Sequence, residues 1–231
     1  PFKGLCGGGV IFKLMQALSK LLDLNDEVVY DYLDLITLGT SSDVVPLSDE
    51  NRIIVKEGLN KLSETQKPGL RALLEVSGLA ENQLSVNGII FRLAPIINAA
   101  GRLGDPNRVV KLFTTESYSE AQKLAHELDR DNRKRQKMQQ SILEESIRKV
   151  NSEIDLSKEK SIVLWDKNWH EGIVGIVAAK IKEIYNRPSI IISLKEGIGK
   201  GSARSVIGFD LFENLSKCKE LLISFGGHPM A

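Results

Sequence analysis

Small residues surround the two basic residues Lys200 and Arg204 in GKGSARS, residues 199–205. Glycines let a ligand approach the backbone closely, serine hydroxyls donate hydrogen bonds, and a guanidinium can bind two phosphate oxygens at once. No acidic residue interrupts the segment. Lys200, Ser202 and Arg204 therefore form a candidate phosphate-binding set, and the alternative is a surface hairpin with a solvated arginine.

A glycine pair and a histidine follow an apolar run in LLISFGGH, residues 221–228. We expect LLISF to form a strand, which places Gly226, Gly227 and His228 at a strand end, where functional loops of α/β sheets commonly lie. The imidazole could donate a hydrogen bond to a phosphate. The alternative is a histidine that caps an element or lies at the edge of the core.

Two further segments carry candidate ligand-binding side chains. In INAAGRLGD, residues 97–105, Arg102 follows small residues and lies four positions after Asn98. The partner of this arginine is either Asp105 or a ligand phosphate. In WDKNWHEGIVG, residues 165–175, Trp169 could stack on a base, but packing in the core is the better interpretation.

Asp43 is the one acid in TLGTSSDVVPL, residues 37–47, and it is the candidate metal ligand of that segment. A catalytic metal site needs several oxygen or nitrogen ligands that converge, so one aspartate cannot form it alone. From the pattern alone, the Asp-x-x-Pro spacing favours a turn in which the carboxylate accepts a backbone hydrogen bond.

The clearest predicted helix covers residues 119–150, because apolar stripes with helical spacing occupy both of its ends. Its middle, DRDNRKRQK at residues 129–137, has no apolar residue and holds five bases and two acids. This pattern predicts a helix that connects two domains, or else an ordinary solvated helix face.

Other periodicities predict the elements on either side of that helix. Helices are expected directly after CGGG and in NRIIVKEGLNKL and KPGLRALLEVSGL. SIVLWD and SIIISL are expected to be strands flanking the helical IVGIVAAKIKEIYN, and FDLFENLSKC a further helix. The chain from about residue 156 onwards is therefore predicted to be a small mixed α/β domain.

The bulk composition excludes several classes of protein. The 31 basic and 30 acidic residues leave a net charge of +1, so any contact with nucleic acid must be local. Cys6 and Cys218 are far apart, without the spacing of a metal site or a disulfide framework, which favours the reducing cytoplasm. No apolar run approaches the ~20 residues that span a bilayer, so no membrane contact is expected.

Taken in order, these segments resemble the RecJ single-stranded-DNA exonucleases of the DHH phosphoesterase superfamily. The matching segments are LCGGGVIFKL, LDLITLGTSSDVVPL, NRIIVKEGL, FRLAPIINAAGRLGD, LDRDNRKRQ, WHEGIVGIVAAKI, RPSIIIS, GKGSARSVIGFDLFENL and FGGHPMA. The resemblance implies an α/β organisation in three parts. Residues 1–118 would be the C-terminal part of a DHH catalytic domain, residues 119–152 a connecting helix, and residues 153–231 a truncated DHH-associated domain that binds phosphates.

The resemblance also implies roles for the candidate residues. Asp43 would bind one of two manganese or magnesium ions that serve phosphodiester hydrolysis, or bridge both, and Arg102 and His228 would join it in the catalytic set. Nucleic-acid phosphates would be bound by Asn98, Arg133, Gln136, Lys200, Ser202, Arg204, Gly226, Gly227 and His228. The implied substrate is single-stranded DNA, degraded 5′ to 3′ in DNA repair and recombination, and the implied partners are a single-stranded-DNA-binding protein and a helicase.

Two departures from the family pattern qualify this expectation. An Asp-His-His triplet does not occur in the 231 residues, and no sequence for an OB-type domain follows FGGH. We therefore expect a fragment of a RecJ-like protein that is inactive by itself. The alternatives are a DHH-type phosphodiesterase for short oligoribonucleotides or cyclic dinucleotides, and a non-catalytic nucleic-acid-binding module.

Overall fold

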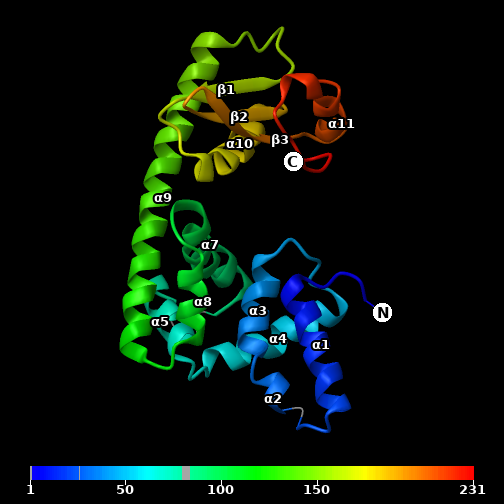
Figure 1. Ribbon diagram of the computed structural model, residues 1–231, viewed down its shortest axis with the longest axis vertical. Helices are drawn as coiled ribbons and strands as arrows, with labels where there is room; N and C mark the ends of the chain where they lie inside the picture. Colours follow the sequence, from blue (N-terminus) through cyan, green and yellow to red (C-terminus); the bar gives the residue numbers. More distant parts are fainter. Residues whose placement is uncertain (1, 26, 80–83) are drawn as a thin grey trace. The chain divides into compact units, whose positions relative to one another are not determined.

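The structure is a computed structural model that describes residues 2–25, 27–79 and 84–231. Contacts divide the chain into two units, Pro1–Asn132 and Arg133–Ala231. The boundary falls inside the longest helix, α9 (Tyr118–Glu153), so each unit contains one part of it (Figure 1). The long helix predicted from two apolar stripes is therefore confirmed.

Helices build the N-terminal unit (Figure 1). In chain order they are α1 (Gly7–Leu21), α2 (Glu27–Tyr30), α3 (Leu33–Ser42), α4 (Asp49–Ser63), α5 (Pro68–Ser77), α6 (Val86–Gly88), a π-helical turn (Ile89–Leu93), α7 (Ala94–Leu103) and α8 (Asn107–Thr114). The helices predicted after CGGG and at residues 51–62 and 67–79 are confirmed. Within the described ranges, no helix is both long and apolar enough to cross a membrane.

The main core of this unit lies among α5, α7, α8 and the first turns of α9. Its fully buried members include Leu70, Leu73, Ile96, Leu112 and Leu128. Because each of these helices has an apolar stripe of helical period, their shared burial accounts for the arrangement of the unit. The apolar stripe predicted at the start of α9 is thus part of this core.

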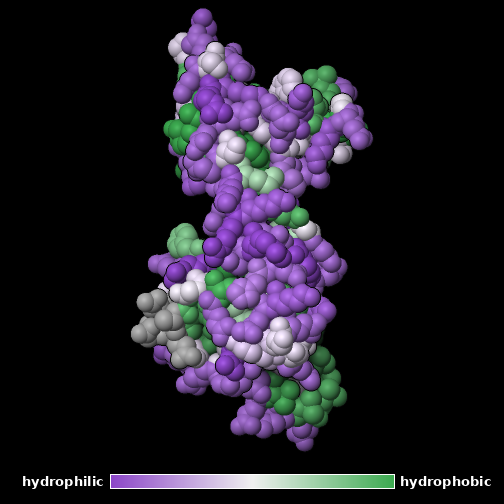
Figure 2. All heavy atoms as spheres, turned by 90° about the vertical axis from the view of Figure 1, so that its left-hand side faces the viewer, coloured by the Kyte–Doolittle hydropathy of each residue, from purple (hydrophilic) through white to green (hydrophobic). Residues whose placement is uncertain are grey.

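Helix α1 has two apolar faces, of which one is buried and the other is exposed. Phe12 is buried against Val29, Leu33 and Ile54. On its other side the large apolar residues Val10, Ile11, Leu14 and Leu18 are between 44% and 55% exposed. Figure 2 shows hydrophobic residues gathered at the lower end of this unit, where α1 ends. Helical period thus predicted the helix, but not that this second face stays exposed.

A three-stranded sheet forms the centre of the C-terminal unit (Figure 1). Strand β1 (Ile162–Asp166) is parallel to the central strand β2 (Ser189–Lys195), and the edge strand β3 (Ile198–Arg204) is antiparallel to β2. Helix α10 (Glu171–Tyr185) connects β1 to β2. The predicted strand-helix-strand unit is therefore confirmed.

The segment after β3 agrees with the sequence only in part. The predicted helix is present as α11 (Leu211–Ser216), but the predicted strand in LLISF is wrong. Residues 219–221 form a 3₁₀ turn and residues 222–225 an irregular segment, in which Phe225 packs against Phe212 of α11. A strand needs a neighbouring strand to pair its backbone groups, which a short apolar run does not specify.

Candidate nucleic-acid interface

Side chains of β3 alternate between the two faces of the sheet, and the pairing register assigns each residue to a face. Ser202 pairs with Ile191 and Arg204 with Ser189, both of which are buried. Directly paired residues share a face. Ser202 and Arg204 therefore lie on the face that α10 covers, while Gly201 and Ala203 belong to the opposite face.

Arg204 is held by neutral acceptors. Its Nη1 donates to the Ser202 Oγ at 3.1 Å and to the backbone oxygen of Ala203 at 2.6 Å. Among the described residues no carboxylate forms an ion pair with this guanidinium, which is half-buried. A guanidinium whose charge is not neutralised by an acid is suited to binding phosphate oxygens.

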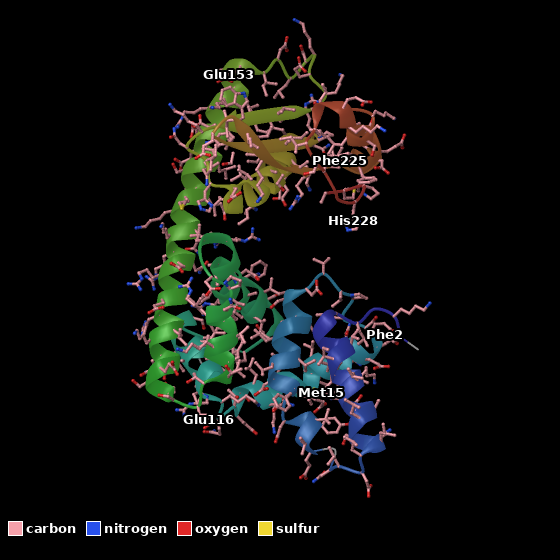
Figure 3. All side chains as sticks on the ribbon, in the orientation of Figure 1. Phe2, Met15, Glu116, Glu153, Phe225 and His228 are labelled. Atoms are coloured by element: carbon pink, nitrogen blue, oxygen red, sulfur yellow. The ribbon has the colours of Figure 1, made fainter. Side chains whose placement is uncertain are left out.

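The segment with the glycine pair lies beside the end of β3. The backbone N–H of Ser205 donates to the backbone oxygen of Met230 at 2.9 Å, and that of His228 donates to Ala231 at 2.6 Å. Figure 3 shows His228 on the loop that follows Phe225, with its side chain projecting away from the ribbon. The exposed imidazole is thus available to a ligand near the Arg204 end of β3.

A cavity of about 550 Å³ lies beside β3, next to most of the phosphate-binding residues predicted for this unit. The apolar face of the sheet opposite α10 forms its floor, and α11 and the segment that contains Phe225 form its sides. Gly226, Gly227 and His228 line it, and Ser202 and Arg204 border it although their side chains lie on the α10 face. The two sequence motifs therefore meet in space, although the predicted strand before the glycine pair does not form.

Lys200 differs from the other predicted residues of GKGSARS. Its Nζ lies 3.0 Å from Oε2 of Glu171, in the first turn of α10, and it does not line the cavity. The hydrogen bond and charge of Lys200 lower the pKa of Glu171. Sequence reasoning missed Glu171, because the two residues are 29 positions apart and only the fold makes them neighbours.

In the N-terminal unit, Asp43 and Asn98 lie at one mostly apolar cavity of about 440 Å³ or next to it. Ser42, at the end of α3, and Asn98, in α7, both line this cavity, and Asp43 directly follows Ser42. Arg102 is half-buried in the last turn of α7. The carboxylate of Asp105, its suggested partner, accepts the backbone N–H of Asn107.

Asp43 is exposed and extended, and its Oδ1 accepts the N–H of Val44 at 2.8 Å. In the described part of the chain, no group of three or more His, Cys, Asp or Glu side chains is arranged to bind a metal ion. The donors present here therefore do not make up a complete metal site. Asp43 offers one carboxylate. Its Oδ1 accepts the Val44 N–H, and its Oδ2 is left to bind a metal ion.

The predicted nucleic-acid-binding residues of α9 are exposed to solvent. Arg133 and Gln136 are both exposed on α9, as are Lys134 and Lys137. Asp131, one of the two acids in this basic segment, lies 2.6 Å from a guanidinium nitrogen of Arg108. Because that pairing neutralises an acid, the exposed surface of the segment is mainly basic.

Trp169 is confirmed as a core residue. It is 2% exposed, and its Nε1 donates to Glu145 Oε2 of α9 at 2.8 Å. The other tryptophan, Trp165, is 59% exposed on β1. A base-stacking role for Trp169 is therefore excluded by its burial.

Known proteins resemble this chain along its whole length. The single-stranded-DNA-specific exonuclease RecJ of Bacillus subtilis is 44% identical over 234 residues, and that of Escherichia coli is 36% identical over 251 residues. Both alignments cover 100% of this chain, but only 29% and 43% of the relatives.

Solved structures give the same result. RecJ from Thermus thermophilus in complex with Mg²⁺ matches 96% of this chain at 36% identity, with a TM-score of 0.84, and the chain covers 34% of it. An exonuclease RecJ bound to manganese matches 99% at 37% identity, with a TM-score of 0.85 and 56% of that protein covered. Residues 158–231 match the DHHA1 domain family. Residues 158–231 are thus similar to the DHHA1 domain family, and the whole chain is similar, in sequence and fold, to a part of the RecJ single-stranded-DNA-specific exonucleases.

Proposed function

We propose that this chain is part of a metal-dependent exonuclease that degrades single-stranded DNA from the 5′ end in DNA repair and recombination. The observation that carries the proposal is the similarity to RecJ over the whole chain, at 36% to 44% identity. A second observation supports it: Arg204 is held by neutral acceptors at the end of β3, and the segment with His228 lies beside that end. The proposal includes action in the cytoplasm with a single-stranded-DNA-binding protein and a helicase.

The proposed roles follow from exposure and charge. Ser202, Arg204 and His228 bind phosphates of the single-stranded DNA. The exposed lysine and arginine side chains of α9 extend this contact along the DNA backbone. Asn98 and Arg102 contribute from α7, and Asp43 supplies one carboxylate to the manganese or magnesium ions that RecJ structures contain. In this proposal residues 1–118 belong to the DHH domain, residues 119–152 form the helix that connects it to the DHH-associated domain, and residues 153–231 form that second domain, which binds phosphates.

For the 231 residues alone, binding without hydrolysis is the expected behaviour, because the described residues lack a complete metal site. Purified chain should retain a single-stranded oligonucleotide in an equilibrium binding assay and release no nucleotide from it with manganese. Robust manganese-dependent degradation that Asp43→Ala abolishes would refute this expectation.

A substrate series separates the proposal from its rival, a phosphodiesterase for oligoribonucleotides or cyclic dinucleotides. Oligonucleotides of DNA and RNA, from two to about twenty nucleotides, are compared for binding. Affinity should rise with the length of the oligonucleotide, because each further phosphate can contact a basic side chain of α9 or β3. Preference for dinucleotides over longer single strands would support the rival.

A further inference from the structure

Gly175 occupies an unusual position for a glycine. It lies in the second turn of α10, a helix of 15 residues, between the buried residues Val174 and Val177. Glycine is disfavoured relative to alanine inside a helix, so a glycine there indicates that a side chain would not fit.

The neighbours of Gly175 are the two β3 side chains of the candidate phosphate site. A Cβ at this position would lie 3.0 Å from the Ser202 Oγ and 3.6 Å from the Arg204 Nη2. The first distance is shorter than most observed contacts of a Cβ atom, so the hydroxyl would have to shift, and the second is an ordinary van der Waals contact. The missing methyl group therefore makes room for the Ser202 hydroxyl.

That hydroxyl also holds the arginine. Ser202 Oγ accepts a hydrogen bond from Arg204 Nη1 at 3.1 Å, so an atom that pushes the hydroxyl away from α10 also removes an acceptor from the guanidinium. We infer that Gly175 is a positioning residue: by leaving space for Ser202, it fixes Arg204 in the orientation that binds nucleic-acid phosphate. This inference rests on the proposed function of the β3 site.

A double-mutant comparison tests it on the full 231-residue chain. Gly175→Ala is made in the native background and in the Ser202→Ala background, where the nearest remaining Ser202 atom, its Cβ, is an ordinary 3.5 Å away. The probe is a 5′-phosphorylated single-stranded DNA oligonucleotide, followed by fluorescence anisotropy. Gly7→Ala of α1 is the matched control, because an added Cβ there meets nothing within 4 Å.

In the native background, we expect Gly175→Ala to weaken binding about three- to tenfold, within the range of coupling between residues in contact. In the Ser202→Ala background it should change the affinity by less than about twofold, because the obstructed atom is gone. Gly7→Ala should leave the affinity unchanged. Equal losses in both backgrounds, or no loss in the native one, would overturn the inference.

Two readouts keep this test separate from folding and from the proposed function. If Gly175→Ala unfolds the chain by circular dichroism and Ser202→Ala does not restore it, glycine serves the helix-sheet packing and the inference is wrong. If Arg204→Ala itself leaves binding intact, the phosphate role of the β3 site fails. If only Arg204→Ala weakens binding, that role stands and the role of Gly175 falls.

Discussion

Nζ of Lys149, in α9, lies 2.8 Å from Oδ2 of Asp166 at the end of β1, and it also donates to the backbone oxygen of Trp165 at 2.9 Å. The two charged side chains are 22% and 18% exposed. The hydrogen bond from Lys149 and that from the N–H of Asn168 hold the pKa of Asp166 below its ordinary value. Within the C-terminal unit, Lys149 thus joins α9 to the first strand of the sheet.

Asp166→Asn should make the C-terminal unit less stable in a pH-dependent way. A carboxyl group with a lowered native pKa contributes stability that is fully present above its unfolded pKa of about 3.9 and is lost as the pH falls through the native value. We expect a loss of about 1–3 kcal/mol at neutral pH, which shrinks below about pH 4.

Urea unfolding measures this effect, because both tryptophans of the chain, Trp165 and Trp169, lie close to Lys149. Glu159→Gln, at an exposed position of the same unit, is the control. A stability difference between Asp166→Asn and the native chain that stays constant from neutral to acid pH would contradict the assignment.

Two glycines of the N-terminal unit should respond oppositely to alanine. At Gly58 of α4, a Cβ would lie 1.8 Å from Oγ1 of Thr37 and 2.6 Å from the backbone oxygen of Leu33, so α3 and α4 approach each other closely only through glycine. Gly58→Ala should cost about 1–3 kcal/mol or more through overpacking. At Gly39 of α3 a Cβ meets nothing within 4 Å, and Gly39→Ala should stabilise by about 0.5–1 kcal/mol.

Thermal unfolding of the two alanine variants provides the comparison. The melting temperature should fall for Gly58→Ala and rise for Gly39→Ala relative to the native chain. Shifts of the same sign would mean that the packing of α3 against α4 differs from the structure.

Two aspartates of the N-terminal unit separate stability from function. Asp34 is 0% exposed and accepts hydrogen bonds from Thr65 Oγ1 at 2.9 Å and Lys67 Nζ at 2.8 Å, whereas Asp43 is exposed. Asp34→Ala should destabilise by about 2–4 kcal/mol, because it leaves Lys67, which is 30% exposed, without its carboxylate partner and the Thr65 hydroxyl without its acceptor. Asp43→Ala should change stability by less than about 0.5 kcal/mol.

Urea unfolding of both alanine variants measures the contrast. Asp34→Asn, which keeps an acceptor for Thr65, should recover part of the loss. A destabilised Asp43→Ala variant would assign that residue a structural role and contradict this contrast.

The sequence predicted elements where the pattern is local. The two apolar stripes of α9 and the alternation between strand and helix period from β1 to β2 fix those elements within a few residues. The LLISF strand was wrong, because strand formation depends on a distant partner rather than on the five residues themselves. For the same reason, the period of α1 could not reveal that one of its apolar faces remains exposed.

The candidate site was predictable as a set of residues, but not as a set of contacts. Glycine, serine and arginine in GKGSARS made phosphate binding one of two interpretations of that segment, and it stays a prediction. The pairing of Lys200 with Glu171 and the contact between Gly175 and Ser202 join positions 29 and 27 residues apart, so only the fold could reveal them. A glycine inside the helical pattern IVGIVAAKI was the one local signal for the second contact.

The most direct test of the account is the binding of single-stranded DNA by Arg204→Ala, measured from low to high salt, with Lys180→Ala on exposed α10 surface as the control. Loss of a charge-assisted contact predicts binding that is weaker by about 1.5–3 kcal/mol at low salt, with a salt dependence flatter by about 0.7 log units. The control should match the native chain. Native affinity and native salt dependence in Arg204→Ala would contradict the assignment of the end of β3 as a phosphate-binding site.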